Sequence, residues 1–417
     1  MGRGTTRALA AMIRVLPIAG MVAACASQPR ALPEWTPIPV PDPQSVDVAV
    51  FLIGDAGEAL PGESPVLAHL SAEMETWAQA LGRDSAVAVV YLGDNIYPNG
   101  LHEADDPSFP LDSARLQAQI DVVAGEIARR YAARAIFVAG NHDWGQIITA
   151  EGIQNLENQQ EFIERARERD GLAVFQYPPA GVPGPVVVDM GATARLILLD
   201  TVWWLFLRDE HALDIVFENI GAALSTEGAR EAIVAGHHPL HTAGPHGGLT
   251  PFWRSLGVMF LLRRTGSLLQ DLNSGPYRQL ADDLRQVFEE AGPPLVMAGG
   301  HEHSLQVFGK VLEHDPQFSL VSGSGSKLED VGWAEGMEFR AAEPGYMKIL
   351  FLKDGSVDLF VHSAPEEHQR CLGPSGEPLA DEPRAACIRD GVDAFRTIYS
   401  ARLKGPGGPP DQPDPLN

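Results

Sequence analysis

The chain has 417 residues, with 31 Lys and Arg against 55 Asp and Glu, and its formal charge is −24 at pH 7. Hydrophobic residues make up 45% of it, which excludes a chain that is disordered over most of its length. The negative charge argues against nucleic acid as a partner, and it would also repel an anionic substrate at long range. A site for an anion must therefore be built locally, from metal ions or oriented N–H groups.

The first 24 residues have the composition of an export signal. Three arginines precede an apolar run at residues 15–24, which is too short to span a bilayer as a helix. The run ends in Val-Ala-Ala-Cys, which resembles a bacterial lipobox, so we expect Cys25 to carry lipid and to begin the mature chain. By the same resemblance, Ala26 favours an exported lipoprotein of the outer membrane that faces the periplasm or the cell surface. An ordinary signal peptide with an unrelated cysteine, and N-myristoylation of Gly2, are the alternatives.

The segments that flank the centre of the chain differ from it in composition. Residues 25–47 contain six prolines and are predicted to form a semi-rigid tether before a folded domain at residues 48–363. Residues 364–417 form a C-terminal extension whose end is rich in Gly, Pro and Asp and is predicted to be disordered. Cys371 and Cys387 are an even pair in an exported chain, so a disulfide is expected, with two free thiols as the alternative. The bridge would close a loop of about 17 residues and stabilise the fold by roughly 3 kcal/mol.

Between these flanks, short apolar runs alternate with longer segments of helical periodicity. Buried strands are predicted at residues 48–53, 86–92, 135–139, 195–199, 232–235 and 295–298. Helices are predicted at residues 67–81, 111–131, 154–169 and 277–291. This alternation favours an α/β core.

Nearly every apolar run ends in a cluster of Gly with Asp, Asn or His. In open α/β sheets, ligands bind at this carboxyl end of the strands. The five clusters are Gly-Asp-Ala-Gly at 54–57, Gly-Asp-Asn-Ile-Tyr at 93–97, Gly-Asn-His-Asp at 140–143, Gly-His-His-Pro at 236–239 and Gly-His-Glu-His at 300–303. Carboxylate, amide and imidazole ligands suit Fe, Mn and Zn. The core has no cysteine, which excludes a zinc site of thiolates, and neither a serine nucleophile elbow nor a P-loop lysine pattern is present.

At these clusters the sequence resembles the metallophosphatase (calcineurin-like phosphoesterase) superfamily, and most of all its purple acid phosphatase branch of the small tartrate-resistant type. The resemblance runs from about residue 48 to residue 362 and includes Leu-Asp-Thr-Val at 199–202 and Ser-Gly-Ser-Gly at 322–325. Two departures from the general pattern favour this branch. Gly57 stands where most relatives have a histidine ligand, and Tyr97 lies three residues after Asp94, where the branch has a tyrosinate that binds ferric iron.

The resemblance implies a four-layer α/β sandwich, with two mixed β-sheets flanked by α-helices, formed by a single catalytic domain. It also implies two metal ions, Fe(III) with a divalent Fe, Zn or Mn ion. The implied ligands of the first ion are Asp55, Asp94, Tyr97 and His303, and those of the second are Asp94, Asn141, His237 and His301. Two cations about 3.5–4 Å apart can clamp a phosphoryl group during in-line attack by a hydroxide that they hold.

Two further histidines are expected to act on the substrate. His142 adjoins Asn141, at a position that contacts the phosphate in the family, and His246 matches a histidine at the mouth of the site. Either could protonate a leaving alkoxide, while His246 could also be a loop residue without a role. His238 is interpreted as a residue that supports the ligands or lines the rim, and Asp143 as a local hydrogen-bond acceptor rather than a ligand.

The leading function predicted from the sequence is hydrolysis of phosphate monoesters, with a small phosphorylated substrate. Phosphodiester or nucleotide hydrolysis at the same site, and a surface lipoprotein that binds metal or phosphate without turnover, are the alternatives. An apolar insertion around residues 251–276 allows three interpretations: a lid over the substrate, a segment that rests on the membrane, or an extra packed helix. The expected partners are the substrate and, through lipid on Cys25, a membrane, whereas nucleic acid is not expected.

Overall fold

The computed structural model describes residues 28–146, 149–207, 209–225, 230–247, 274–373 and 379–407. The predicted signal peptide, the predicted lipid site at Cys25, most of the insertion around residues 251–276, and residues 408–417 lie outside the described residues. Within the described part, no helix is both long enough and apolar enough to cross a membrane.

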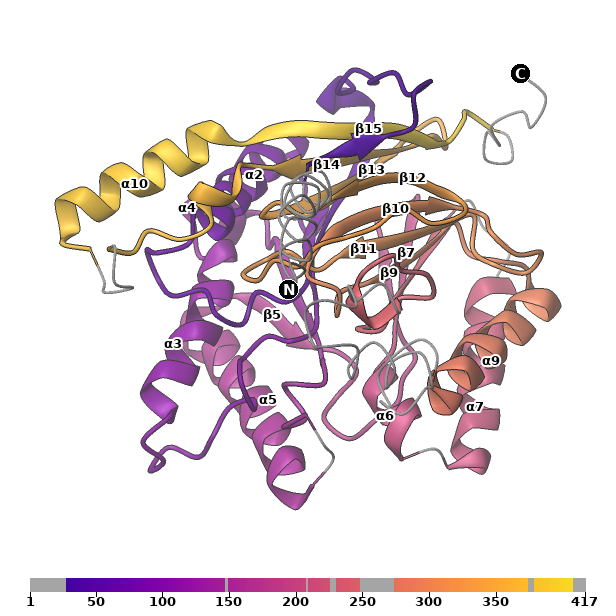
Figure 1. Ribbon diagram of the computed structural model, residues 1–417, viewed down its shortest axis with the longest axis horizontal. Coiled ribbons are helices and arrows are strands. Elements are labelled where there is room, and N and C mark those ends of the chain that lie inside the picture. Colours follow the sequence, from indigo (N-terminus) through magenta and orange to yellow (C-terminus); the bar gives the residue numbers. More distant parts are fainter. Residues whose placement is uncertain are drawn as a thin grey trace, which may run out of the picture.

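The described strands form two mixed sheets (Figure 1). The eight-stranded sheet has the order β1 (Arg30–Ala31), β12 (Met337–Ala341), β10 (Leu305–Gly309), β11 (Phe318–Ser322), β9 (Val296–Gly299), β8 (Glu231–Ala235), β7 (Ala194–Leu198) and β6 (Val186–Met190). The seven-stranded sheet has the order β15 (Arg396–Lys404), β14 (Val357–Ser363), β13 (Gly345–Leu352), β2 (Val46–Ile53), β3 (Val87–Leu92), β4 (Arg134–Val138) and β5 (Ala173–Gln176). In the seven-stranded sheet, β2, β3, β4 and β5 run parallel to one another, and in the eight-stranded sheet β7, β8, β9 and β11 do the same. The other neighbouring pairs are antiparallel.

The central strands are buried on both faces, as the continuous apolar runs predicted. In β2, Val50 and Leu52 lie in the core between the two sheets, whereas Phe51 and Ile53 pack under the helices. Burying a side chain of this kind contributes about 1.5–3 kcal/mol. The alternation along each strand therefore holds the sheets to each other and to the helices.

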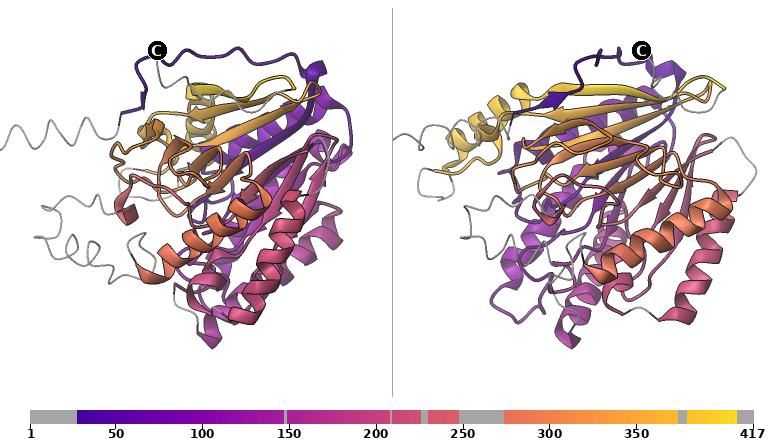
Figure 2. Two further views of the ribbon diagram at one scale, coloured as in Figure 1. Left: turned by 90° about the vertical axis from the view of Figure 1, so that its right-hand side faces the viewer. Right: turned by 45° about the vertical axis from the view of Figure 1, so that its right-hand side comes forward.

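Helices cover the outer face of each sheet (Figure 2). The seven-stranded sheet is covered by α2 (Pro65–Leu81), α3 (Phe109–Ile120), α4 (Glu126–Arg130) and α5 (Ala150–Asp170), and α10 (Asp381–Ala394) packs on α2. The eight-stranded sheet is covered by α6 (Thr201–Phe206), α7 (Glu210–Ser225) and α9 (Gly275–Ala291). This is the predicted α/β sandwich of two mixed sheets between helices, so the expected fold class is confirmed.

The prediction of a single helix at residues 111–131 is wrong. α3 ends at Ile120, a 3₁₀ turn follows at Asp121–Val123, and α4 is a separate short helix. Glu75 of α2 accepts hydrogen bonds from the N–H groups of Ile127 and Ala128, at 3.2 and 2.8 Å. A side chain from another helix therefore supplies the first turn of α4 with acceptors and stabilises the break.

Both ends of the described chain pack on the domain. β1 pairs with β12, and Trp35 stacks on Tyr399 of β15 with ring centroids 5.4 Å apart. The predicted tether thus includes a segment that lies against the domain. In the C-terminal extension, β15 pairs with β14 at the edge of its sheet, and the expected disulfide between Cys371 and Cys387 is confirmed.

Candidate metal centre

The five polar clusters meet at one end of the two sheets. Three of them follow β2, β3 and β4 in the seven-stranded sheet, and two follow β8 and β9 in the eight-stranded sheet. Hydrogen bonds join the sheets there, from the N–H of Gly54 to the carbonyl of Ser322 at 2.6 Å and between His237 Nδ1 and the Leu92 carbonyl at 2.8 Å. The carboxyl ends of parallel strands therefore gather side chains that are far apart in the sequence.

One group of donors consists of Asp55, Asp94, Tyr97 and His303. The Tyr97 hydroxyl lies 3.0 Å from Asp55 Oδ1 and 3.3 Å from His303 Nε2. Ligand atoms of Asp55, Asp94 and His303 all lie within 4.8 Å of one another. Oxygen and imidazole nitrogen atoms that converge so closely form a cradle for one cation.

A second group consists of Asn141, His237 and His301. Asn141 Oδ1 lies 2.8 Å from His237 Nε2 and 3.2 Å from His301 Nδ1, and these two ring nitrogens are 3.2 Å apart. Asp94 reaches this group as well, because its Oδ1 is 3.5 Å from His237 Nε2. Asp94 therefore lies between both groups, in the position that a ligand shared by two ions requires. The fold thus brings together all seven predicted metal ligands.

Three of these residues have backbone conformations that side chains seldom adopt. The angle φ is +58° at Asp55, +55° at Asp94 and +68° at His301. Such a conformation costs about 1–3 kcal/mol and persists where the surroundings hold it. Asp55 Oδ2 accepts the N–H of His301 at 2.9 Å, which ties two of the strained residues together. Three of the six non-Gly residues with positive φ in the described part of the chain thus lie where the donors converge.

The geometry explains why residue 57 is not a histidine. Gly57 donates its N–H to the Asp94 carbonyl at 3.0 Å. A β carbon at residue 57 would lie 2.6 Å from that oxygen, which is too close for any side chain. A histidine there would force the loops of Asp55 and Asp94 apart, and Tyr97 supplies the additional donor beside Asp55 instead.

In the protein alone, burial favours uncharged side chains at the centre. Burial, followed by the charge of Asp94, raises the pKa of Asp55 well above its usual range, and burial with the charge of Asp55 does the same to the pKa of Tyr97. Burial also raises the pKa of Asp94, but His237 and His142 outweigh it and lower that pKa to about 2. Burial lowers the pKa of His303 to about 3. Cations stabilise ionised acids and neutral imidazoles, so this donor set fits a pair of metal ions.

Neighbouring groups orient two of the imidazoles. His237 Nδ1 faces the Leu92 carbonyl, and His303 Nδ1 lies 3.4 Å from Glu329 Oε2, so in both rings Nε2 is turned toward the acids. Partners of this kind fix the tautomer of a metal-binding histidine and change metal affinity by roughly 10–100-fold. The sequence patterns do not indicate Glu329, because only the fold places it beside His303. There the N–H of Glu329 donates to the His303 carbonyl at 2.9 Å.

The two predicted catalytic histidines also lie at the centre. His142 Nδ1 faces the Pro98 carbonyl at 2.6 Å, which leaves His142 Nε2 at 3.8 Å from Asp94 Oδ2. The side chain of His142 is 21% exposed, so part of it is accessible to a substrate. The ring of His246 lies against that of His301, with centroids 4.3 Å apart. Both rings therefore lie beside the metal donors, His142 next to Asp94 and His246 next to His301.

His238 and Asp143 occupy buried positions beside the ligands. His238 is 1% exposed and its Nδ1 lies 2.9 Å from Thr201 Oγ1, which excludes the interpretation of His238 as a rim residue. Its Nε2 has no hydrogen-bond partner among the described residues, and His238 offers a ligand atom within 4.8 Å of those of His237 and His301. Asp143 accepts the N–H groups of Asn95 and Gly140 at 2.9 and 2.7 Å, which confirms it as a local acceptor.

Lys327 is a charged residue of the centre that the sequence patterns missed. Its Nζ lies 3.4 Å from the centroid of the Tyr97 ring. Burial lowers the pKa of Lys327, and the carboxylates of Asp94 and Asp55 oppose that shift. The one signal in the sequence was its place two residues after the Ser-Gly-Ser-Gly stretch at 322–325.

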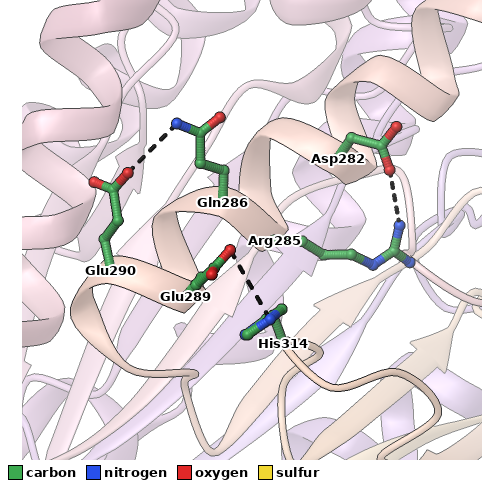
Figure 3. Close-up of a pocket in the computed structure, with 6 residues that line it drawn as sticks. All are labelled: Asp282, Arg285, Gln286, Glu289, Glu290 and His314. Carbon is green, nitrogen blue, oxygen red and sulfur yellow. Dashed lines mark hydrogen bonds and ion pairs between the residues drawn. The ribbon is translucent and has the colours of Figure 1, made fainter.

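A second gathering of titratable side chains lies along α9 (Figure 3). A hollow of about 500 Å³ is lined by Asp282, Arg285, Gln286, Glu289, Glu290 and His314. Arg285 pairs with Asp282 at 3.4 Å, and His314 lies 3.9 Å from Glu289. The side chains of Asp282 and Glu289 are 70% and 62% exposed. These charges pair with one another at the surface instead of converging on a point.

A family model for calcineurin-like phosphoesterases matches residues 50–305, which is more than half of the chain. The chain belongs to the calcineurin-like phosphoesterase family. This family consists of metal-dependent phosphoesterases with two metal ions in the site, and the paired donor groups around Asp94 have the chemistry that such a site needs.

Two solved structures are similar to this calcineurin-like phosphoesterase. GAP50, described as the anchor in the inner membrane complex of Plasmodium, is 13% identical with a TM-score of 0.50, over 85% of this chain and 96% of that one. The purple acid phosphatase PPD1 from yellow lupin (Lupinus luteus) seeds is 16% identical with a TM-score of 0.46, over 79% of this chain and 53% of that one. At such identities a likeness bears on the fold alone. No curated protein matches the chain.

Proposed function

We propose that the protein is a dinuclear-metal phosphatase that hydrolyses phosphate monoesters. The observation that carries the proposal is the pair of donor groups that share Asp94. A bridged pair of ions serves in-line displacement at phosphorus, whereas a protein that only binds metal needs no bridge. Gly57 and Tyr97 favour the purple acid phosphatase branch and, with it, monoesters as substrates.

Bound at these groups, two cations would activate a water molecule and stabilise charge on the phosphoryl oxygens. The group that contains Tyr97 suits Fe(III), because two carboxylates and a phenolate are hard anionic ligands. The group of Asn141, His237 and His301 is uncharged apart from Asp94 and suits a divalent Fe, Zn or Mn ion. A Tyr97 phenolate bound to Fe(III) would colour the oxidised protein through charge transfer to the iron, so Tyr97→Phe should abolish that visible absorption and leave the second ion in place. Metal analysis that finds no iron would contradict this assignment but not the dinuclear site.

His142 and His246 are proposed to act on the two ends of the scissile bond. His142 Nε2 is close to Asp94 and would bind the phosphoryl oxygens, so His142→Ala should slow alkyl and aryl phosphates alike. His246 lies against His301 and would protonate the leaving oxygen. General-acid catalysis contributes about 10²–10⁴-fold where the leaving group needs a proton, as an alkoxide does and nitrophenolate does not. Equal losses on a matched alkyl and aryl pair in His246→Ala would contradict that role.

Turnover of matched aryl monoesters and diesters, with metal analysis of the same sample, tests the proposed function. The proposal predicts two metals per chain and a higher kcat/KM for the monoester. Preference for the diester would favour the phosphodiesterase alternative. A protein that holds metal and turns over neither ester would favour the alternative of a surface lipoprotein that binds metal or phosphate.

We also propose that the phosphatase is an outer-membrane lipoprotein attached through Cys25. The proposal is supported by the Val-Ala-Ala-Cys sequence at residues 22–25 and its apolar run. Cys25→Ser should release the protein from the membrane or leave it unprocessed. Mass spectrometry of the mature N-terminus that finds no lipid on residue 25 would contradict the attachment.

A further inference from the structure

We propose that Lys327 binds the phosphoryl group of the substrate and favours monoester dianions over diester monoanions. The inference rests on the proposed function, because it assigns a substrate preference to the same site. The loop that follows β11 carries Lys327 to the metal centre.

Hydrogen bonds hold this loop against the loop of Asp55. Gly325 donates its N–H to the Gly54 carbonyl at 3.1 Å, and Ser326 Oγ donates to the Asp55 carbonyl at 2.6 Å. On the other side of Lys327, the N–H of Glu329 donates to the His303 carbonyl at 2.9 Å. The backbone around Lys327 is thus fixed to the two residues that flank the Tyr97 hydroxyl.

Glycines allow this close approach. A β carbon at Gly323 would lie 2.7 Å from Asp55 Oδ2, and one at Gly325 would lie 2.6 Å from the Gly54 carbonyl oxygen. Neither contact is tolerable for a side chain. The glycines of the Ser-Gly-Ser-Gly stretch therefore allow the loop to lie against the metal centre, which places Lys327 beside Tyr97.

The ammonium of Lys327 lies on the face of Tyr97 and is free to extend. Its Nζ is 3.4 Å from the ring centroid, and its side chain is 28% exposed. It approaches Glu58 Oε1 at 3.7 Å, which is a loose contact, and Glu58 pairs with Arg370 at its other oxygen. A lysine offers three donors on a flexible stem and acts on phosphate as a point charge. The geometry lets Lys327 turn from Glu58 to an oxygen of a phosphate held at the centre.

Charge explains why such a lysine discriminates between esters. A monoester at neutral pH carries up to two negative charges on its phosphoryl oxygens, and a diester carries one. The rest of the chain is strongly acidic and repels both, the dianion more than the monoanion. A local cation beside the metal centre reverses that order, since attraction scales with the charge of the ligand.

The competing explanation is that Lys327 only braces Glu58, and the Glu58→Gln variant separates the two. If Lys327 is a brace, Glu58→Gln breaks the same pair and should behave like Lys327→Gln. If Lys327 binds phosphate, Glu58→Gln removes a competitor for the ammonium and should leave phosphate binding unchanged or tighter. The two explanations therefore predict different results for one variant, a loss of phosphate binding if Lys327 is a brace and no loss if it binds phosphate.

The experiment measures kcat/KM for matched aryl monoesters and diesters, the inhibition constant of inorganic phosphate, and metal content. In Lys327→Gln we expect monoester kcat/KM and phosphate affinity to fall about 10–100-fold, the usual range for a hydrogen bond to a charged group, with a smaller loss for the diester and unchanged metal content. Lys327→Arg should restore part of the loss. Lys310→Gln makes the same change in net charge at an exposed residue beyond the far end of β10 and should have no effect.

Equal losses for both esters, unchanged phosphate inhibition, or a loss in Glu58→Gln that matches the loss in Lys327→Gln would overturn the proposal for Lys327. These results are distinct from a failure of the proposed function. If the function is wrong, the wild-type protein itself lacks the two metals or hydrolyses neither ester, whereas a failure of Lys327 alone leaves the wild-type turnover intact.

Discussion

The metal centre and the hollow along α9 both gather acids, amides and histidines, yet they differ in what the side chains face. At the centre, Asp55, Asp94 and His237 are 0–2% exposed and their donor atoms converge. In the hollow (Figure 3), the acids are largely exposed and each is paired with a neighbour at 3.4–3.9 Å. Titratable residues gather at both places, so it is burial with convergence that marks a site for a ligand.

The difference has an energetic origin. A buried carboxylate without a partner is strongly unfavourable, and it shifts its pKa or binds a cation. Pairs on an exposed helix face contribute between zero and about 1 kcal/mol and are common without any ligand. The ionised side chains of the metal centre therefore need a bound cation to be stable, whereas the charges in the hollow are already paired with one another.

The largest expected contrast is in metal binding. Asp94→Ala should remove both ions and lower turnover by more than roughly 10³-fold, because even residues that only orient a ligand change metal affinity by 10–100-fold. Asp282→Asn, in the hollow, should change neither. Metal analysis and turnover on the purified variants check the pair. Near-normal activity with two metals in Asp94→Ala would show that Asp94 is not shared.

Chelation of the metals should lower the thermal stability of the protein. When the free metal concentration is 100 times the dissociation constant, metal binding stabilises the folded state by about 2.7 kcal/mol. This corresponds to a few degrees in Tm for a large domain. The loss should occur in Asp282→Asn as in the wild type and should be absent in Asp94→Ala. Scanning calorimetry with and without chelator measures it, and a chelator effect that persists in Asp94→Ala would place the stabilising ion elsewhere.

A smaller effect is expected from Asp315, which anchors α9 beside the hollow. Arg285 Nε and His241 Nε2 lie 2.8 and 2.7 Å from its carboxylate. Burial raises the pKa of Asp315, but hydrogen bonds from His241 and Arg285 outweigh it and lower the pKa to about 2. Because the folded-state pKa lies below the usual 3.8, this stability is complete above pH 4 and is lost as the pH falls toward 2.

Asp315→Asn should therefore reduce the free energy of unfolding by about 1–2 kcal/mol at pH 7, a value discounted because its partners His241 and Arg285 are 17% and 20% exposed and solvent screens them. Its metal content should stay normal. Urea unfolding at pH 7 and at pH 3 tests this, since the difference from the wild type should shrink at the lower pH. An unchanged difference would mean that Asp315 does not act through its charge.

The smallest effect is expected from Glu289, whose side chain is 62% exposed and lies 3.9 Å from His314. Glu289→Gln should change the free energy of unfolding by less than about 0.5 kcal/mol, as for other exposed pairs. Urea unfolding measures the change. A loss above 1 kcal/mol would show that the hollow is more than a solvated helix face.

The strands that carry the donors could be predicted from the sequence because each is a short apolar run that ends in a Gly cluster. All six predicted strands are present, and the clusters that follow five of them meet at one edge. β13 was missed because Lys348 interrupts its apolar run. Lys348 is nevertheless buried, since Glu73 of α2 pairs with it at 2.6 Å. That contact joins residues 275 positions apart, and a local pattern cannot register it.

The same limit applies at the site. The five clusters could be recognised from the sequence, because they lie on the same short segments as the strand ends, and the resemblance to the family implied which seven of their residues are metal ligands. Lys327 and Glu329 were missed, since their neighbours Tyr97 and His303 come from other parts of the chain. For His238 the sequence allows a position that supports the ligands or one at the rim, and only its burial against Thr201 decides against the rim.

The most direct test of a bridged metal pair is anomalous diffraction from crystals of the wild-type protein, with the metals identified by elemental analysis. We predict two ions about 3.5–4 Å apart, one beside Asp55, Tyr97 and His303, the other beside Asn141, His237 and His301, with Asp94 between them. A single ion at the centre, or ions at the hollow along α9 with none at Asp94, would contradict the metal centre described above.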